Sequence, residues 1–175
     1  MKSVFVTGAH DGTGFAIASR FAREGYAVFI GSRDPEKAGK AAGAIAAAYG
    51  VPTKGYAYQT KTLDEGQVDA IFADIRRQGY LLDALVLNAA NLGIGQVSFD
   101  VDIADFMGVF TTNVGWNFLM ARAAARQMKE KGRGAIVFIG SNSAIRVTEN
   151  RCAYCSSKNA IIGMSKSFAV GWGRY

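Results

Sequence analysis

The chain has 175 residues, of which 50% are hydrophobic and 19% are charged, so it holds enough apolar material for one packed domain and is not intrinsically disordered. Its 21 glycines against 2 prolines exclude a proline-rich linker and a collagen-like chain. The net charge of +6 raises the question of a nucleic-acid partner, but the cations are spread along the chain.

Strands and helices are predicted to alternate along the whole chain. Short apolar runs predict strands, and apolar side chains at three- and four-residue steps predict helices. In chain order these are a strand at residues 4–6, a helix at 15–24, a strand at 26–30, a helix at 34–49, a strand at 53–59, a helix at 64–78, a strand at 82–87, a helix at 103–129, a strand at 135–139 and a helix from 152 to the end. Continuously apolar strands are typical of a parallel sheet covered on both faces by helices, and no linker or repeat divides the chain. We therefore predict a single doubly wound α/β domain spanning residues 1–175.

The turn between the first strand and the first helix is rich in glycine. It reads Thr7-Gly8-Ala9-His10-Asp11-Gly12-Thr13-Gly14. Glycines at this spacing let the backbone pass close to a diphosphate, to which the helix N-terminus offers free N–H groups and partial positive charge. Glycine also serves simple tight turns, so the position at the first strand–helix junction is what favours a dinucleotide site. The residues expected to lie against the cofactor here are Gly8, His10, Asp11, Gly12, Thr13 and Gly14.

The end of the second strand bears on the choice between NADP(H) and NAD(H). A carboxylate there would bind the ribose hydroxyls and repel a 2′-phosphate. This chain instead has Ser32, a hydroxyl donor, and Arg33, whose guanidinium suits a phosphate. Asp34 precedes Pro35 and is interpreted as the cap of the next helix. Ser32 and Arg33 together favour NADP(H) and leave NAD(H) open. The alternative interpretation is that Arg33 is an exposed side chain that binds no ligand.

Tyr154 and Lys158 are one turn apart on the last predicted helix and so share a face. A nearby ammonium favours the phenolate form, which suits Tyr154 to acid–base catalysis. A tyrosine and a lysine at this spacing also occur as an ordinary surface pair, so the position of the two residues in the fold decides between the interpretations. Ser141 follows the fifth predicted strand, as Gly8 and Asn88 follow earlier ones, and parallel α/β sheets bind ligands at that edge.

Together these residues resemble the short-chain dehydrogenase/reductase family in its common single-domain form. The TGxxxGxG turn of that family is matched in full by residues 7–14, and its NNAG segment is matched in part by Asn88 and Ala89. Its polar catalytic set is matched by Asn113, Ser141, Tyr154 and Lys158. The resemblance covers essentially the whole chain.

The resemblance implies a Rossmann-type sheet with strand order 3-2-1-4-5 and a hydride transfer between a nicotinamide and a carbonyl or secondary alcohol carbon. Tyr154 would act as general acid or base, and Lys158 would favour its phenolate and hold the nicotinamide ribose. Ser141 would hydrogen-bond the substrate oxygen, with Ser143 as a candidate second substrate contact. Asn113 would hold a water that links Lys158 to solvent.

The length of the chain leaves alternatives open. Family members usually continue past the last helix with further strands and a substrate-covering segment, so we expect either a fragment of a longer protein or a reduced member of the family. A reduced member would be a non-catalytic NADP(H)-binding or sensor protein. A nucleic-acid partner is not expected, because the basic cluster at residues 126–133 contains Glu130 and lies at a predicted helix end.

Composition limits the remaining possibilities. Two cysteines and one histidine cannot assemble a four-ligand zinc site, and Cys152 and Cys155 are interpreted as small residues at a helix start, so no metal is expected. No apolar run is long enough for a membrane span, and the N-terminus is unlike a signal peptide, so a cytoplasmic protein is expected. The helices at residues 103–129 and 152–174 carry more large apolar side chains than one sheet face needs, which favours a homodimer or homotetramer.

Overall fold

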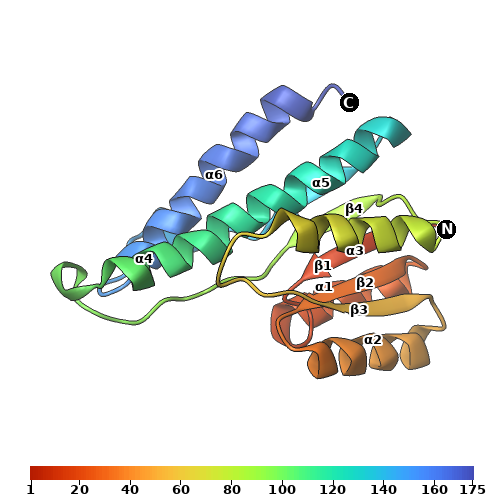
Figure 1. Cartoon of the computed structure of the whole chain (residues 1–175), viewed down its shortest axis with the longest axis horizontal. Coiled ribbons are helices and arrows are strands. Elements are labelled where there is room, and N and C mark those ends of the chain that lie inside the picture. The colour runs from red at the N-terminus through yellow and green to blue at the C-terminus, as the bar shows by residue number, and fades with distance from the viewer.

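The computed structural model describes all 175 residues, and a five-stranded sheet runs through its centre (Figure 1). The strands lie in the order β3-β2-β1-β4-β5, and every neighbouring pair is parallel. Their bounds are β1 Ser3–Thr7, β2 Ala27–Ser32, β3 Thr53–Ala57, β4 Ala84–Leu87 and β5 Ala135–Phe138. The predicted fold class and strand order are therefore confirmed. The chain crosses from β3 to β4, so the sheet changes winding direction between β1 and β4.

Helices cover both faces of the sheet. The α-helices are α1 Gly12–Arg23, α2 Pro35–Tyr49, α3 Glu65–Arg77, α4 Ile103–Phe110, α5 Trp116–Lys131 and α6 Cys152–Trp172, with short 3-10 turns η1 Ser98–Asp100 and η3 Asn142–Ala144. Figure 1 shows α3 and α5 on one side of the sheet and α2 on the other. None of these helices combines the length and apolarity needed to span a membrane.

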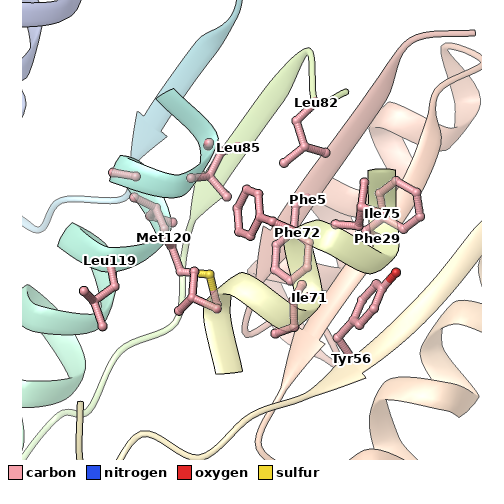
Figure 2. Close-up of a cluster of buried hydrophobic side chains, with 14 of the residues drawn as sticks. Phe5, Phe29, Tyr56, Ile71, Phe72, Ile75, Leu82, Leu85, Leu119 and Met120 are labelled. Atoms are coloured by element: carbon pink, nitrogen blue, oxygen red, sulfur yellow. The ribbon is translucent and has the colours of Figure 1, made fainter. Parts of the chain in front are cut away.

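The side chains of β1 point alternately to the two faces of the sheet and so belong to two separate core clusters. Phe5 packs with residues of α3 and α5, whereas Val4 and Val6 pack with residues of α1 and α2. Successive side chains of a strand point to opposite faces, so one fully buried strand supplies both clusters. Figure 2 shows Phe5 and Phe72 in the larger cluster, where their rings stack at 6.2 Å between centroids.

Aspartates fix the starts of the second and third helices, and the cap at Asp34 was predicted from the sequence. Asp34 accepts hydrogen bonds from the N–H groups of Glu36 and Lys37, and α2 ends at Gly50 in the left-handed region at φ 66°. Asp64 accepts from the N–H group of Gln67 and so begins α3. A short side-chain oxygen satisfies N–H groups that have no partner inside the helix.

The helix predicted as one piece at residues 103–129 is interrupted. The π-helical turn η2, Thr111–Gly115, separates α4 from α5 and places Asn113 inside the molecule. The Asn117 side chain donates through Nδ2 to the carbonyl oxygen of Asn113 at 2.7 Å, which satisfies a carbonyl that a regular helix would pair with a backbone N–H. The predicted long helix is therefore present, and the π-helical turn within it, which buried amide side chains stabilise, was not predicted.

Two strands are shorter than predicted. β3 ends at Ala57 instead of residue 59, and β4 begins at Ala84 instead of residue 82. Asp83, just before β4, accepts from the N–H group of Ser3 at 2.9 Å and pairs with Lys131 at 2.6 Å. The Asp83 carboxylate therefore binds the Ser3 N–H group at the start of β4, where a sheet would otherwise use a backbone carbonyl.

Candidate active site

The loops that follow the strands gather at one edge of the sheet. Asn88 follows β4 and donates through Nδ2 to the carbonyl oxygens of Thr7 and Gly8, at 3.1 and 3.0 Å. The Thr7 hydroxyl accepts from the N–H groups of Asn88 and Ala89 at 2.9 and 3.0 Å. The loop after β4 is thus tied to the glycine turn after β1, at the point where the sheet changes winding direction.

The three glycines of the turn differ in the space that surrounds them. Gly8 has φ 60°, and a Cβ there would lie 2.9 Å from Ala89 Cα. A Cβ on Gly14 would lie 2.6 Å from Asn88 Nδ2, so both positions exclude a side chain for packing reasons. Gly12 has φ 51°, yet a Cβ there would meet nothing within 4 Å. The backbone at Gly12 therefore faces open space at the start of α1.

The N-terminus of α1 is left without a side-chain cap. Asp11 occupies the N-cap position but its side chain accepts no hydrogen bond from the N–H groups of α1, whereas aspartates cap α2, α3 and α4. The first N–H groups of a helix point out of its end and carry partial positive charge. An uncapped helix end beside open space fits the diphosphate of a dinucleotide, and Gly12 lets such a group approach.

The predicted phosphate donor Ser32 is already hydrogen-bonded within the protein. It is buried, and its Oγ accepts from the N–H group of Asp34 at 3.1 Å and lies 3.2 Å from His10 Nδ1. Arg33 is exposed beside it, and its carbonyl oxygen accepts from the Gln59 side chain at 3.3 Å. The structure thus places His10, Ser32 and Arg33 together at the end of β2, where the nearby Asp34 carboxylate caps α2.

Tyr154 and Lys158 lie side by side on α6. Nζ of Lys158 is 5.8 Å from the centre of the Tyr154 ring and donates to the carbonyl oxygen of Ile139 at 2.7 Å. Lys158 is only 2% exposed and has no carboxylate partner, and burial lowers the pKa of its ammonium group. Tyr154 is half-buried. The predicted pairing of these two side chains is therefore present in the structure.

The two candidate substrate serines differ in their contacts. Ser141 Oγ accepts from the N–H group of Ser143 at 3.1 Å and so begins η3, which packs against α6. The Ser143 hydroxyl lies 3.5 Å from that of Thr148. Both serines are half-buried. Ser141 is thus held next to the helix that carries Tyr154, whereas Ser143 is turned to the loop before that helix.

Asn113 joins three segments around Tyr154. Its Oδ1 accepts from the N–H group of Asn91 at 2.6 Å, and its Nδ2 donates to the Asn91 carbonyl and to Ser157 Oγ, both at 2.9 Å. Ser157 in turn donates to the carbonyl oxygen of Tyr154 at 2.8 Å. The Asn113 side chain thus ties the β4 loop to α6, and the expectation that Asn113 holds a water for Lys158 stays a prediction.

Sequence reasoning missed Asn91, Asn117 and Ser157. Ser157 lies between Tyr154 and Lys158, and its signal was a polar residue on the helix face predicted to point inward. Its contact with Asn113 could not be inferred, because that contact depends on the π-helical turn. No group of three or more histidine, cysteine or acidic side chains lies close enough to hold a metal ion.

Known proteins share this arrangement over nearly the whole chain. A family model described as short chain dehydrogenase matches residues 2–175. A 3beta-hydroxysteroid dehydrogenase of Mediterraneibacter gnavus is 32% identical over 171 residues, which are 98% of this chain and 60% of that protein. The NAD+-bound xylitol dehydrogenase superposes with a TM-score of 0.91 at 31% identity, over 98% of this chain and 65% of that one. A metagenomic short-chain oxidoreductase in complex with NADP superposes with a TM-score of 0.89 at 27% identity, over 97% of this chain and 75% of that one.

The similarity extends to the parts of the fold that form the site. The chain spans 60% of the length of the matched steroid dehydrogenase. From the family match over residues 2–175, the chain belongs to the short-chain dehydrogenase family.

Proposed function

We propose that this chain forms the cofactor-binding and catalytic part of an NADP(H)-dependent oxidoreductase that interconverts a carbonyl group and a secondary alcohol. The observation that carries the proposal is the buried ammonium of Lys158, which has no carboxylate partner and lies 5.8 Å from the Tyr154 ring centre. A buried, unpaired charge is costly for folding alone. Its presence at the ligand-binding edge of a parallel sheet supports a catalytic purpose.

The cofactor site is built from the ends of β1, β2 and β4. The N-terminus of α1 and the Gly12 backbone would hold the diphosphate, and Asn88 and Ala89 keep the neighbouring loop in place. Ser32, Arg33 and His10 would hold an adenosine 2′-phosphate, and the use of the nearby Asp34 carboxylate to cap α2 favours NADP(H). One solved relative binds NADP and another binds NAD+, so NAD(H) is the alternative cofactor. When bound, the nicotinamide supplies or accepts the hydride.

The proton is moved by Tyr154. In reduction its phenol donates a proton to the substrate carbonyl oxygen, and in oxidation its phenolate takes the proton from the alcohol. The ammonium of Lys158 lies 5.8 Å from the centre of the Tyr154 ring, and a cation there attracts the negative charge that forms on the tyrosine oxygen during proton transfer. The ammonium of Lys158 also donates hydrogen bonds to the nicotinamide ribose. Burial of Lys158 keeps water from weakening both interactions.

Ser141 and Asn113 position the reacting groups. The Ser141 hydroxyl donates to the substrate oxygen as negative charge develops there, in place of its 3.4 Å contact with the Asn142 side chain. Asn113 holds the Asn91 loop and α6 at a fixed separation. Ser143 is a second substrate contact only if it leaves Thr148.

The test is NADPH or NADH oxidation over a panel of ketones and aldehydes, followed by the absorbance of the reduced nicotinamide, with cofactor affinity measured in parallel by fluorescence. NADPH should bind more tightly than NADH, and at least one carbonyl should be turned over. Tight NADPH binding without turnover of any carbonyl would instead identify a non-catalytic NADP(H)-binding protein. Failure to bind either nucleotide would overturn the proposal.

We further propose that two or four copies assemble through α4, α5 and α6. Ile103 is 71% exposed and Val170 is 87% exposed, and Phe118 is also exposed on α5. Exposed apolar side chains on neighbouring helices favour burial against a second copy. Light scattering at micromolar concentration should give a dimer or tetramer mass, and a monomer would contradict this assignment.

A further inference from the structure

The two cysteines of the chain, Cys152 and Cys155, share the first turn of α6 and take no part in the proposed proton transfer. α6 begins at Cys152, and the N–H group of Cys155 donates to the carbonyl oxygen of Arg151 at 2.9 Å, which closes the turn. Both side chains are free thiols. The helix start predicted at Cys152 is therefore confirmed, and it carries two thiols on one turn.

The spacing of the two residues permits a disulfide under some strain. In a regular α-helix, residues three apart have Cα atoms about 5 Å apart, inside the range of about 4.4–6.8 Å found in disulfides. Their Cβ atoms are about 5–6 Å apart on a helix surface, whereas a disulfide holds them at about 3.5–4.5 Å, so the turn must tighten by about 1–2 Å. The first turn of a helix can tighten, because its first N–H groups have no partner inside the helix. A strained disulfide is easily reduced, so we expect a reversible bond and not a permanent one.

The two thiols differ in exposure, which sets the order in which they react. Cys155 is only 4% exposed, and its Sγ lies 4.0 Å from the carbonyl oxygen of Thr148. Cys152 is half-buried and can be reached from solvent. A buried cysteine by itself acts as a small apolar side chain, whereas an accessible cysteine beside a second one is the arrangement of a redox-active dithiol. Cys152 is thus the thiol that meets a reagent, and Cys155 is the thiol that meets Cys152.

We infer that Cys152 and Cys155 form a thiol–disulfide exchange site for small disulfides of the glutathione class. The Cys152 sulfur attacks one sulfur of the small disulfide, whose S–S bond breaks, and the first glutathione leaves as a thiol with the Cys152 proton. The Cys155 sulfur then attacks the Cys152 sulfur of this mixed disulfide, and the second glutathione leaves with the Cys155 proton. The two protein thiols are thereby oxidised to one disulfide, and one small disulfide is reduced to two thiols.

The exchange site goes beyond the proposed function, although it lies next to the candidate active site. Tyr154 stands between the two cysteines on α6. The exchange itself needs no nucleotide, no carbonyl substrate and no turnover. Failure of the exchange would therefore leave the proposed oxidoreductase activity untouched, and failure of nucleotide binding would leave the exchange untouched.

The test is intact-mass analysis of the full native chain after incubation with oxidised glutathione and an acid quench. The wild type should lose two hydrogens, carry no glutathione and keep the mass of a single chain. An excess of reduced glutathione should then restore the original mass, because the bond is strained. A wild type that stays reduced, keeps a glutathione adduct or becomes disulfide-linked to a second chain would overturn the inference.

Cys155→Ala and Cys152→Ala are matched variants, each of which keeps one thiol. Cys155→Ala should stop at a stable adduct of one glutathione per chain, because the thiol that resolves the mixed disulfide is gone. Cys152→Ala should form an adduct at least about tenfold more slowly, because its remaining thiol is buried and reacts only when the helix end opens. Far-UV circular dichroism checks that each variant is folded, and the wild-type result decides the inference where one is not. Equal adduct rates for the two folded variants would refute the assigned order of reaction.

Discussion

Ser157 holds α6 to the π-helical turn, and its removal has a calculable effect. Its side chain is fully buried, donates to the Tyr154 carbonyl at 2.8 Å and accepts from Asn113 Nδ2 at 2.9 Å. Ser157→Ala leaves one buried N–H group of Asn113 without a partner, which costs about 1–3 kcal/mol. Alanine is the better helix former by about 0.5 kcal/mol, so the free energy of unfolding should fall by about 1–2 kcal/mol in total.

The neighbouring Ser156 is exposed and provides a matched control. For a chain of this size Ser157→Ala should lower Tm by about 2–8 °C in thermal unfolding followed by far-UV circular dichroism, whereas Ser156→Ala should leave Tm unchanged or raise it slightly. Because Ser157 also fixes the backbone of Tyr154, the alanine variant should lose kcat more than it raises the KM for cofactor. Equal Tm and equal kcat for the two variants would refute the positioning role of Ser157 and the clamp described for Asn113.

Three further changes test other parts of the structure. Lys158→Met removes a buried ammonium without a carboxylate partner, so Tm should rise or stay level while turnover falls at least about 100-fold; a lower Tm would show that the ammonium stabilises the fold. Gly31→Ala would place a Cβ 2.7 Å from the Tyr58 ring, so the variant should lose about 1–3 kcal/mol in urea unfolding, and an unchanged midpoint would contradict the packing at the end of β2. Hydrogen bonds, foremost that from Lys54, hold the pKa of Asp74 below its unfolded value, so its stabilisation is complete above about pH 4 and is lost as pH falls toward the folded pKa. The Tm difference between wild type and Asp74→Asn should accordingly be largest at neutral pH and shrink in acid; a difference independent of pH would count against this ion pair.

The sheet and the helix starts follow from local signals. The apolar runs of β1, β2 and β4 admit no polar face, so they predict strands buried on both sides. Asp34 before Pro35 predicts the cap and first turn of α2 without knowledge of the tertiary structure. These interactions join residues that are close in sequence, which is why the sequence alone is enough to predict them.

The site is less predictable, because its contacts join distant segments. The Tyr154–Lys158 pair follows from helical spacing, but the partners of Asn113 come from the β4 loop and from α6 and depend on a π-helical turn with no sequence signal of its own. Ser32 was predicted as a free phosphate donor, yet its hydroxyl meets the ring of His10, which is 22 positions away in sequence. Only the parallel pairing of β1 with β2 brings those two residues together.

The central claim is that Tyr154 moves the proton in a carbonyl–alcohol interconversion at this site. Its most direct test is a comparison of wild type and Tyr154→Phe, with NADPH affinity and NADPH-dependent reduction of the same carbonyl substrate measured on each protein. We expect an NADPH dissociation constant unchanged within about twofold and turnover reduced by about 100-fold or more, because only the phenolic proton is lost. Equal turnover by the two proteins would contradict the claim.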